Sequence, residues 1–276
     1  ESLHSLFLNR VKQIKKRLFQ NIILFKMRVA EENLYQFYNA IGMAKMVSKV
    51  RSFDYSVLSE ETGKWPQMVY DIKNAENPGK RLVELFETIE KKEYPNYVLM
   101  GTQYIDQNSL DVMRSKNIFP ILRWELMELC LPRQLAKNNI SNIQIREMKD
   151  EANIVEYADL VNTELLLQYK IDVSLLNSLC QMPNMNVLGL FYKEDLVSTL
   201  LIFIHEATAG LYFIATKKPF RGKGFAQELI NFALQFLCEK GIQKVVLQSV
   251  QKAVPLYSRI GFSGKGKLVI FSKIKT

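Results

Sequence analysis

Four cationic side chains and two glycines gather within residues 217–224. In chain order they are Lys217, Lys218, Arg221, Gly222, Lys223 and Gly224. An apolar pattern of helical period begins directly after them, so the glycines lie at the start of a predicted helix. The first N–H groups of a helix have no partner inside it, the helix dipole adds partial positive charge, and glycine lets an anion approach the backbone. The stretch therefore favours a phosphorylated ligand, and from these residues alone a turn with solvated lysines is the alternative.

Other site chemistries find no support in the residue types. The spacing is neither the GxxxxGK[ST] of a nucleotide loop nor the GxGxxG of a dinucleotide turn. Cys130, Cys180 and Cys238 lie far apart without a CxxC pair, so the sequence predicts neither a disulfide framework nor a zinc site, and a cytoplasmic location fits. With His4 and His205 as the sole histidines and no GxSxG elbow, we predict no metal and no serine nucleophile.

The elements that would position this turn are readable from about residue 141 onward. Periodicity predicts helices over 151–167, 173–180, 224–239 and 253–260, and strands over 143–145, 187–192, 196–205, 210–216, 244–248 and 267–271. Three of these strands follow one another through short turns, which is typical of an antiparallel meander. The glycine turn comes directly after the last of the three. We therefore expect a mixed α/β (α+β) fold.

Two motifs in this region resemble those of the GNAT acetyltransferase superfamily. The run from Arg221 to Ala226, RGKGFA, is similar to the [RQ]xxGx[GA] signature whose backbone holds the pyrophosphate of acetyl-CoA. The run from Ala253 to Phe262, AVPLYSRIGF, resembles the "A..LY..lGF" helix found downstream of it. Two motifs in the correct order are more specific than either one alone. The resemblance covers residues 141–276 and implies acetyl-CoA as cosubstrate.

The resemblance also implies roles for individual residues. The backbone of Ile214, Ala215 and Thr216 would run beside the pantetheine arm of the cosubstrate. Tyr257 would stand where the superfamily often places a general acid that protonates the departing thiolate, although a buried structural tyrosine is equally ordinary. The amides expected to cradle the pyrophosphate are those of Arg221, Gly222, Lys223, Gly224, Phe225 and Ala226.

The chain departs from the family pattern where many members have an asparagine before the second motif. Val250 stands there, so a polar contact to the cosubstrate is expected from Gln248 or Ser249 instead. The general base is less defined, because the superfamily varies it and often uses water. The candidates are His205, Glu206 and Glu164, each of which is also compatible with a structural or solvated role.

The first half of the chain repeats the order of the second. Gly79 corresponds to Gly224 and Asn117 to Gly261, with separations of 38 and 37 residues. Asparagine tolerates the left-handed conformation at a helix end, so Asn117 can replace Gly261 there. Met113, however, occupies the place of Tyr257. We interpret this as an internal repeat whose first copy kept the fold and lost the cofactor loop.

The predicted organisation is two GNAT-like domains, each a twisted, mostly antiparallel sheet flanked by helices. Residues 1–140 form the degenerate domain and residues 141–276 the catalytic domain. The degenerate domain would form one wall of the acceptor cleft, with Trp65 and Tyr70 either lining this cleft or buried in a core. The expected activity is acetyl transfer from acetyl-CoA to a primary amine of a small molecule or peptide. A non-catalytic acyl-CoA-binding regulatory or scaffold protein is the alternative.

Composition narrows the partners further. The formal charge of +9 is spread evenly, +5 over residues 1–140 and +4 over the rest, so we do not expect a nucleic-acid-binding arm. The basic run at 10–17 is expected to form a solvated helix face, and docking on RNA through it is an alternative. No apolar run approaches the length of about 18 residues that a membrane span requires. The acceptor, the acyl chain preference and the oligomeric state stay open.

Overall fold

The computed structural model describes residues 29–44, 46–52, 55–72, 78–131, 140–165 and 168–274, and of residues 78–81 only the backbone. The basic run at 10–17, and with it the RNA-docking alternative, lies outside these ranges. Within them, no helix is long and apolar enough to cross a membrane.

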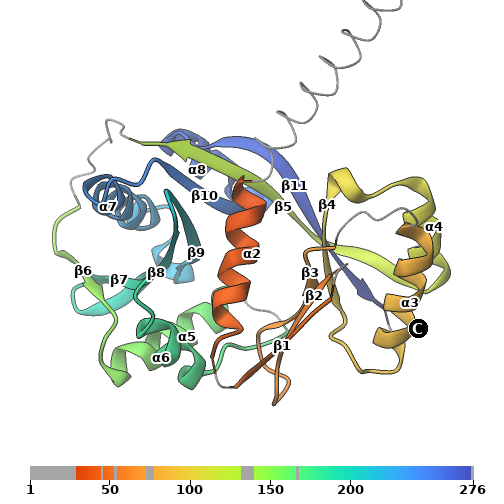
Figure 1. Cartoon of the computed structure of the whole chain (residues 1–276). Coiled ribbons are helices and arrows are strands. Elements are labelled where there is room, and N and C mark those ends of the chain that lie inside the picture. The colour runs from red at the N-terminus through yellow and green to blue at the C-terminus, as the bar shows by residue number, and fades with distance from the viewer. Residues whose placement is uncertain are drawn as a thin grey trace, which may run out of the picture.

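A single sheet of 11 strands runs through the described residues in the order β1-β2-β3-β4-β11-β5-β10-β9-β8-β7-β6 (Figure 1). The strands are β1 Val47–Arg51, β2 Ser56–Glu60, β3 Gln67–Tyr70, β4 Tyr97–Gly101, β5 Ile118–Cys130, β6 Ile143–Glu147, β7 Met185–Tyr192, β8 Asp195–His205, β9 Thr208–Thr216, β10 Lys244–Ser249 and β11 Ser263–Lys273. The α-helices are α2 Val29–Ile41, α3 Pro78–Glu90, α4 Gln107–Ser115, α5 Glu151–Glu164, α6 Val173–Cys180, α7 Phe225–Glu239 and α8 Val254–Ile260. Single-turn 3₁₀ helices cover η1 Thr102–Tyr104, η2 Lys218–Phe220 and η3 Gln251–Ala253.

The two halves of the chain exchange strands at the centre of the sheet. β5, from the first half, lies between β10 and β11 of the second, and β11 lies between β4 and β5 of the first. β5 pairs with β11 from Ile118 to Glu128 and with β10 from Glu125 to Cys130. The two sheets that the sequence predicts are therefore continuous with each other, since each half supplies a strand that the other half needs.

The same order of elements occurs twice along the chain. β3-α3-β4-α4-β5 in the first half matches β9-α7-β10-α8-β11 in the second. Each series holds one parallel strand pair, β3 with β4 and β9 with β10, whereas the remaining named strand pairs are antiparallel. The predicted mixed α/β fold with a mostly antiparallel sheet and flanking helices is confirmed.

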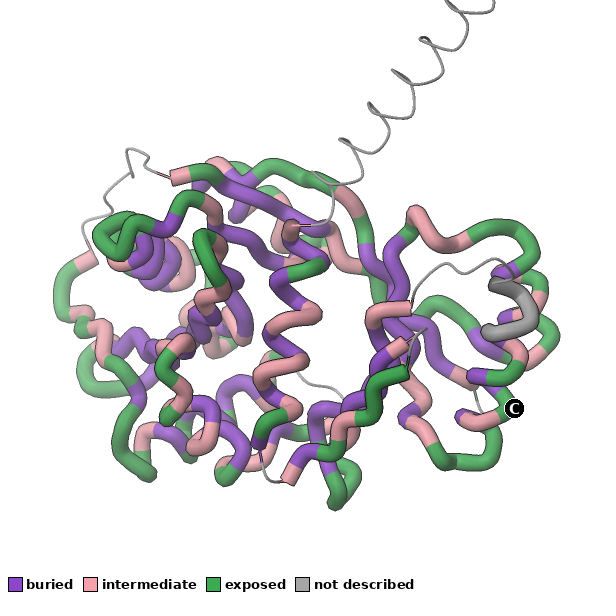
Figure 2. Tube along the Cα trace, in the orientation of Figure 1, coloured by how far each residue is buried: buried purple, intermediate pink, exposed green. Residues whose placement is uncertain are grey.

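Three apolar clusters hold helices against the sheet. The buried stretches of the chain are drawn purple in Figure 2. α3 and α4 pack with the first-half strands and with β11 in one cluster, and α7 and α8 pack with the second-half strands and with β5 in another. The third cluster joins α2, α5 and α6 to strands of both halves. Each of the three clusters therefore contains residues of both halves.

Helix α2 stands at the centre of the molecule, between the two parts of the sheet (Figure 1). It belongs to the first half by chain order, yet it contacts β8, β9 and β10 of the second. The Phe37 ring stacks on Tyr212 with 4.0 Å between ring centroids, and it lies 5.6 Å from Phe203. Burying a phenylalanine side chain stabilises a fold by about 1.5–3 kcal/mol, so this helix contributes to the stability of the second half.

Candidate active site

Strands β9 and β10 run parallel and then part. They pair from Thr208 opposite Lys244 to Leu211 opposite Leu247. β9 continues to Thr216 and β10 to Ser249, but no pairing joins these continuations among the described residues. Among the described residues, no strand therefore pairs with the β10-facing edge of β9 along residues 212–216, where the Thr216 carbonyl accepts a hydrogen bond from Arg221. Ile214, Ala215 and Thr216, which the sequence analysis assigned to the pantetheine arm, lie on this stretch.

A β-bulge accompanies the separation of the two strands. Along β8, Thr199 pairs with Ala215 and Leu201 with Tyr212, so two residues of β9 oppose one residue of β8. Phe213, inside the bulge, has a φ of 50°, which costs a non-glycine residue about 1–3 kcal/mol. Its ring packs edge-on against Trp65 at 5.2 Å, and Thr199 Oγ1 donates to its carbonyl at 2.9 Å. First-half packing thus helps to hold an unfavourable backbone conformation where the strands part.

The glycine turn follows directly after β9. Gly222 and Gly224 have φ values of 77° and 89°, in the left-handed region that glycine adopts without steric cost. α7 begins at Phe225, and its first backbone hydrogen bond is donated by Glu228 to the carbonyl of Gly224 at 3.0 Å. Among the described residues no acceptor reaches the amides at positions 222–227. These amides, at the positive end of a 15-residue helix, form an anion-binding arrangement.

The turn is held from two sides. The guanidinium of Arg221 donates Nε–H to the Thr216 carbonyl at 3.0 Å and forms an ion pair with Glu164. Glu164 also accepts the backbone N–H of Lys218 at 3.0 Å. On the other side, Phe220 packs against Phe225 with 6.0 Å between ring centroids. The charge of Arg221 is therefore balanced within the chain.

Tyr257 lies on α8 and is 6% exposed. It belongs to the same apolar cluster as Phe225 and α7. Desolvation by burial raises the pKa of its hydroxyl to about 12, so the group keeps its proton at neutral pH. No hydrogen-bond partner reaches the hydroxyl within the described part of the chain. A protonated hydroxyl without a protein acceptor is able to donate to a bound group.

Gln248 and Ser249, at the end of β10, have partners inside the chain. Gln248 donates Nε2–H to the carbonyl of Ala30 on α2 at 3.4 Å. Ser249 is buried, and its hydroxyl donates to the Val250 carbonyl at 2.9 Å. Their assignment to the cosubstrate stays a prediction. The contact of Gln248 with the first half of the chain could not be predicted from neighbouring residues, because Ala30 lies 218 residues away.

The three candidates for the general base are separated by the fold. His205 and Glu206 lie at the β8–β9 turn, where His205 pairs with Thr208. Thr208 and Thr216 are the two ends of β9, so this turn is about 26 Å from the cofactor turn at a rise of about 3.3 Å per residue. Glu164 lies beside the turn, and its carboxylate is engaged by Arg221 and Lys218.

Trp65 and Tyr70 are both buried in the shared core. The Tyr70 hydroxyl donates to Asn39 Oδ1 at 2.9 Å. Their alternative assignment as core residues fits this structure, and lining of an open cleft does not. The packing of α2 against the second half was not predicted from the sequence, because the pattern of a short amphipathic helix does not indicate which strands it covers.

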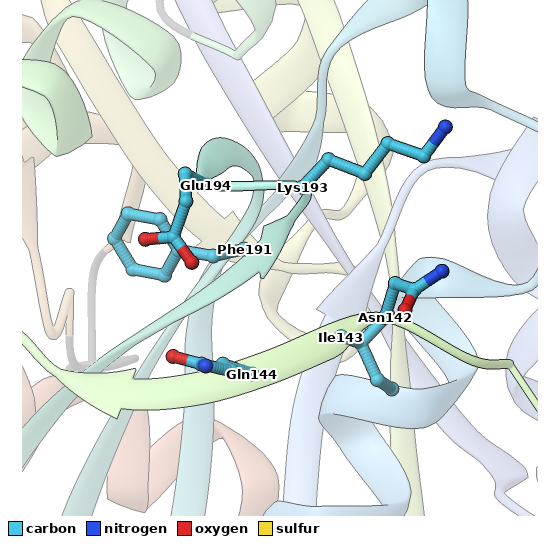
Figure 3. Close-up of a pocket in the computed structure, with 6 residues that line it drawn as sticks. All are labelled: Asn142, Ile143, Gln144, Phe191, Lys193 and Glu194. Atoms are coloured by element: carbon cyan, nitrogen blue, oxygen red, sulfur yellow. The ribbon is translucent and has the colours of Figure 1, made fainter.

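A pocket of about 440 Å³ lies at the outer edge of the sheet, between β6 and the β7–β8 turn (Figure 3). Its lining residues are Asn142, Ile143, Gln144, Phe191, Lys193 and Glu194. None of the residues assigned to the cosubstrate lines it. Arg146, from the same edge strand, places its guanidinium 4.5 Å from the Phe191 ring centroid and forms an ion pair with Glu194 at 2.8 Å.

Within the described ranges, no group of three His, Cys, Asp or Glu side chains is placed to hold a metal ion.

The second half of the chain thus combines a bulged strand that parts from its parallel neighbour, a glycine turn with free amides and a helix carrying a buried tyrosine. The model for the acetyltransferase (GNAT) family matches residues 147–262 of the chain. The match spans both motifs of the sequence analysis, so the predicted family is confirmed for this region.

Two curated proteins are similar over parts of the chain. The first is the SPbeta prophage-derived uncharacterized N-acetyltransferase YokL of Bacillus subtilis, 38% identical over 68 residues, which are 22% of this chain and 38% of that protein. The second is the N-alpha-acetyltransferase MAK3 of Arabidopsis thaliana, 34% identical over 79 residues, 26% of this chain and 42% of that protein. The chain thus spans about two fifths of the length of these relatives.

The similarity to a solved structure extends over both halves. A GCN5-related N-acetyltransferase from Kribbella flavida superposes with a TM-score of 0.64 at 13% sequence identity, covering 91% of this chain and 96% of that one. At this identity the likeness concerns the fold. The first half, which the family model does not reach, is therefore part of a known architecture.

Proposed function

We propose that this chain is an acetyl-CoA-dependent N-acetyltransferase that acylates a primary amine of a small molecule or peptide. The observation that carries the proposal is the row of free amides at positions 222–227, placed where β9 and β10 part. The amides would bind the pyrophosphate of acetyl-CoA. The edge of β9 beyond its last pair with β10 would bind the pantetheine arm and lead the thioester towards the gap between the strands.

The amine would attack the thioester carbonyl directly. Backbone donors near the Phe213 bulge would polarise this carbonyl, since preorganised amides stabilise developing negative charge. A tetrahedral intermediate would form, and the C–S bond would break as the thiolate leaves. Tyr257, which burial keeps protonated at neutral pH, would give its proton to the thiolate and regain one from water, while the amine nitrogen releases its proton to solvent as the amide forms. No residue of the chain becomes acylated in this scheme.

The proposal is tested by calorimetry with coenzyme A on two matched variants, Gly222→Asp and Gly241→Asp. Both glycines have left-handed φ values, 77° and 74°, and a side chain at either one would meet no atom within 4 Å. The backbone cost of the two substitutions is therefore comparable. Only position 222 adds a negative charge beside the free amides, so we expect Gly222→Asp to lose coenzyme A binding and Gly241→Asp to keep it.

Activity is tested in parallel by release of free thiol from acetyl-CoA over a panel of amines. A wild-type chain that binds coenzyme A but acetylates no amine would favour the scaffold alternative. A wild-type chain that does not bind coenzyme A would refute the proposal altogether, and so would equal losses of binding in both glycine variants.

A further inference from the structure

The carboxylate of Glu164 joins two parts of the second half. Oε1 accepts the backbone N–H of Lys218 at 3.0 Å, and Oε2 forms an ion pair with Arg221. The side chain of Glu164 is 14% exposed and that of Arg221 48%. One carboxylate thus contacts both the first residue of η2 and the arginine that begins the glycine turn. Arg221 in turn donates to the carbonyl of Thr216, the last residue of β9.

Glu164 is also the last residue of α5, and the chain beyond it returns to the first half. The carbonyl of Lys170 accepts the backbone N–H of Trp65 at 2.9 Å. The Tyr97 hydroxyl donates to Gln168 Oε1, and the ring of Tyr97 packs edge-on against Tyr169 with 5.0 Å between centroids. The described residues 168–172 are thereby fastened to β4 and to the start of β3.

We propose that Glu164 is a positioning residue that sets the cofactor turn relative to the first half of the chain. The inference rests on the proposed function, because it assumes that the turn binds acetyl-CoA. Residues 168–172 are joined to α5 by Asn162, whose Oδ1 accepts the backbone N–H of Ile171 at 2.7 Å and whose Nδ2 donates to the Ile171 carbonyl at 3.1 Å. Contacts therefore run from the first half through residues 168–172 to α5, and then through Glu164 to Lys218 and Arg221. The degenerate half thereby contributes to cosubstrate binding without touching the cosubstrate.

The direction in which coenzyme A affinity changes when Glu164 is removed distinguishes a positioning role from a purely electrostatic one. Glu164 brings a negative charge to a site that would receive phosphates, so as a mere charge it opposes binding. Its removal would then strengthen coenzyme A binding. As a positioning residue it keeps Arg221 and the amide of Lys218 in place, and its removal weakens binding. The two roles predict opposite changes in the same dissociation constant.

The first experiment compares Glu164→Gln with Glu156→Gln by calorimetry with coenzyme A. Glu156 lies on the same helix, is exposed and carries the same charge, so it is a matched control. We expect Glu164→Gln to raise Kd about fivefold, the upper range for a partly exposed ion pair, and Glu156→Gln to leave it unchanged. The KM for acetyl-CoA should rise in the same proportion, while kcat at saturating acetyl-CoA is retained.

The second experiment tests the link to the first half. Tyr97→Phe removes the hydroxyl that binds Gln168 and leaves the ring that packs on Tyr169. We expect a rise in Kd for coenzyme A of about twofold, from one hydrogen bond at a distance from the ligand. Combined with Glu164→Gln, the effects should be less than additive, because both substitutions interrupt the same series of contacts.

Three results would overturn the inference while the proposed function stands. They are unchanged or tighter coenzyme A binding in Glu164→Gln, an unchanged Kd in Tyr97→Phe, and full additivity in the double variant. A loss of kcat in Glu164→Gln at all acetyl-CoA concentrations would assign the carboxylate to the chemistry instead. Failure of the wild-type chain to bind coenzyme A would refute the proposed function itself. Far-ultraviolet circular dichroism and the Tm of each variant verify that the fold is retained.

Discussion

The two repeated series of elements differ at the positions that would do chemistry and agree at those that build the fold. α8 is followed by Gly261 with a φ of 111°, and α4 is followed by Asn117 with a φ of 58°, so in both halves the chain leaves the helix in the left-handed conformation. Four residues before these positions stand Tyr257 and Met113, both buried. Both halves therefore have a residue with positive φ after the helix, whereas only the second half has a titratable hydroxyl four residues before it.

The strand pairs of the two series also differ. β9 and β10 pair over four positions before they part, and β3 meets β4 at a single position, Val69 opposite Val98. In both halves a residue with positive φ lies two positions beyond the last pair on the first strand, Phe213 in one and Asp71 in the other. The parting of the strands is therefore a property of the repeated fold.

The comparison is tested most severely by cutting the chain between its halves. A fragment of residues 141–276 lacks β5, so β10 loses its antiparallel partner and β11 loses both of its neighbours. It also lacks α2 and the aromatic stack of Phe37 on Tyr212. We expect the fragment to show no cooperative thermal unfolding by circular dichroism, because unpaired strands and uncovered apolar surface cannot hold the sheet together.

Co-expression with residues 1–140 is the control, and it should restore a folded complex. A fragment that unfolds cooperatively near the Tm of the whole chain would show that the second half is an independent domain, with boundaries as the sequence analysis drew them.

The second prediction concerns the tyrosine that the first half lacks. Tyr257→Phe should lower kcat by about 100-fold or more, the usual range for loss of a general acid, while the Kd for coenzyme A stays within about twofold. The hydroxyl has no partner among the described residues, so its removal breaks no contact in the free protein. The measurement is steady-state kinetics with an amine found in the panel, together with calorimetry. A variant with unaltered kcat would assign Tyr257 to the core alone.

Sequence reasoning recovered the local elements and the turn, because both depend on residues close together in the chain. Gly222, Gly224 and Gly261 were assigned from motifs, and each has positive φ in the structure. Asn117 was assigned from its tolerance of the same conformation, and its φ of 58° confirms the assignment. In these places one or two residues decide the backbone, so the inference needed no knowledge of distant contacts.

Long-range arrangement did not follow from the sequence. The insertion of β11 between β4 and β5 depends on which of several similar strands pair, and alternating apolar residues are compatible with many partners. The bulge at Phe213 could not be predicted either, because aromatic residues are common in strands and do not indicate a bulge. Glu164 was considered as a base from its position in the chain, and its contact with Arg221, 57 residues away, became visible in the folded chain.

A third prediction uses the raised pKa of Tyr257 to compare the halves at high pH. A folded-state pKa above the unfolded value of about 10 contributes stability that is present below pH 10 and is lost as pH rises towards about 12. At pH 11 the loss from this group is on the order of 1 kcal/mol. Met113, at the corresponding position of the first half, cannot titrate. The free energy of unfolding of Tyr257→Phe should therefore fall less than that of the wild type between pH 8 and pH 11.

Denaturant unfolding at the two pH values measures this difference. Met113→Leu is the control and should follow the wild type, because it leaves the number of titrating groups unchanged. Equal losses in the wild type and in Tyr257→Phe would mean that the hydroxyl is solvated in the folded protein.

The smallest expected effect concerns the two left-handed helix ends. Gly261→Ala and Asn117→Ala each place an alanine at positive φ, where it costs about 1 kcal/mol relative to glycine. Asparagine already bears part of this cost, so Asn117→Ala should lose less stability than Gly261→Ala, and Asn117→Gly should gain a few tenths of a kcal/mol. Chemical denaturation of the three variants measures the order of their free energies of unfolding.

If the two positions have the same backbone role, Asn117→Gly and Gly261→Asn should change stability in opposite directions by similar amounts. A gain in both would show that the two helix ends are held by different contacts, and the correspondence between the halves would then stop at the order of their elements.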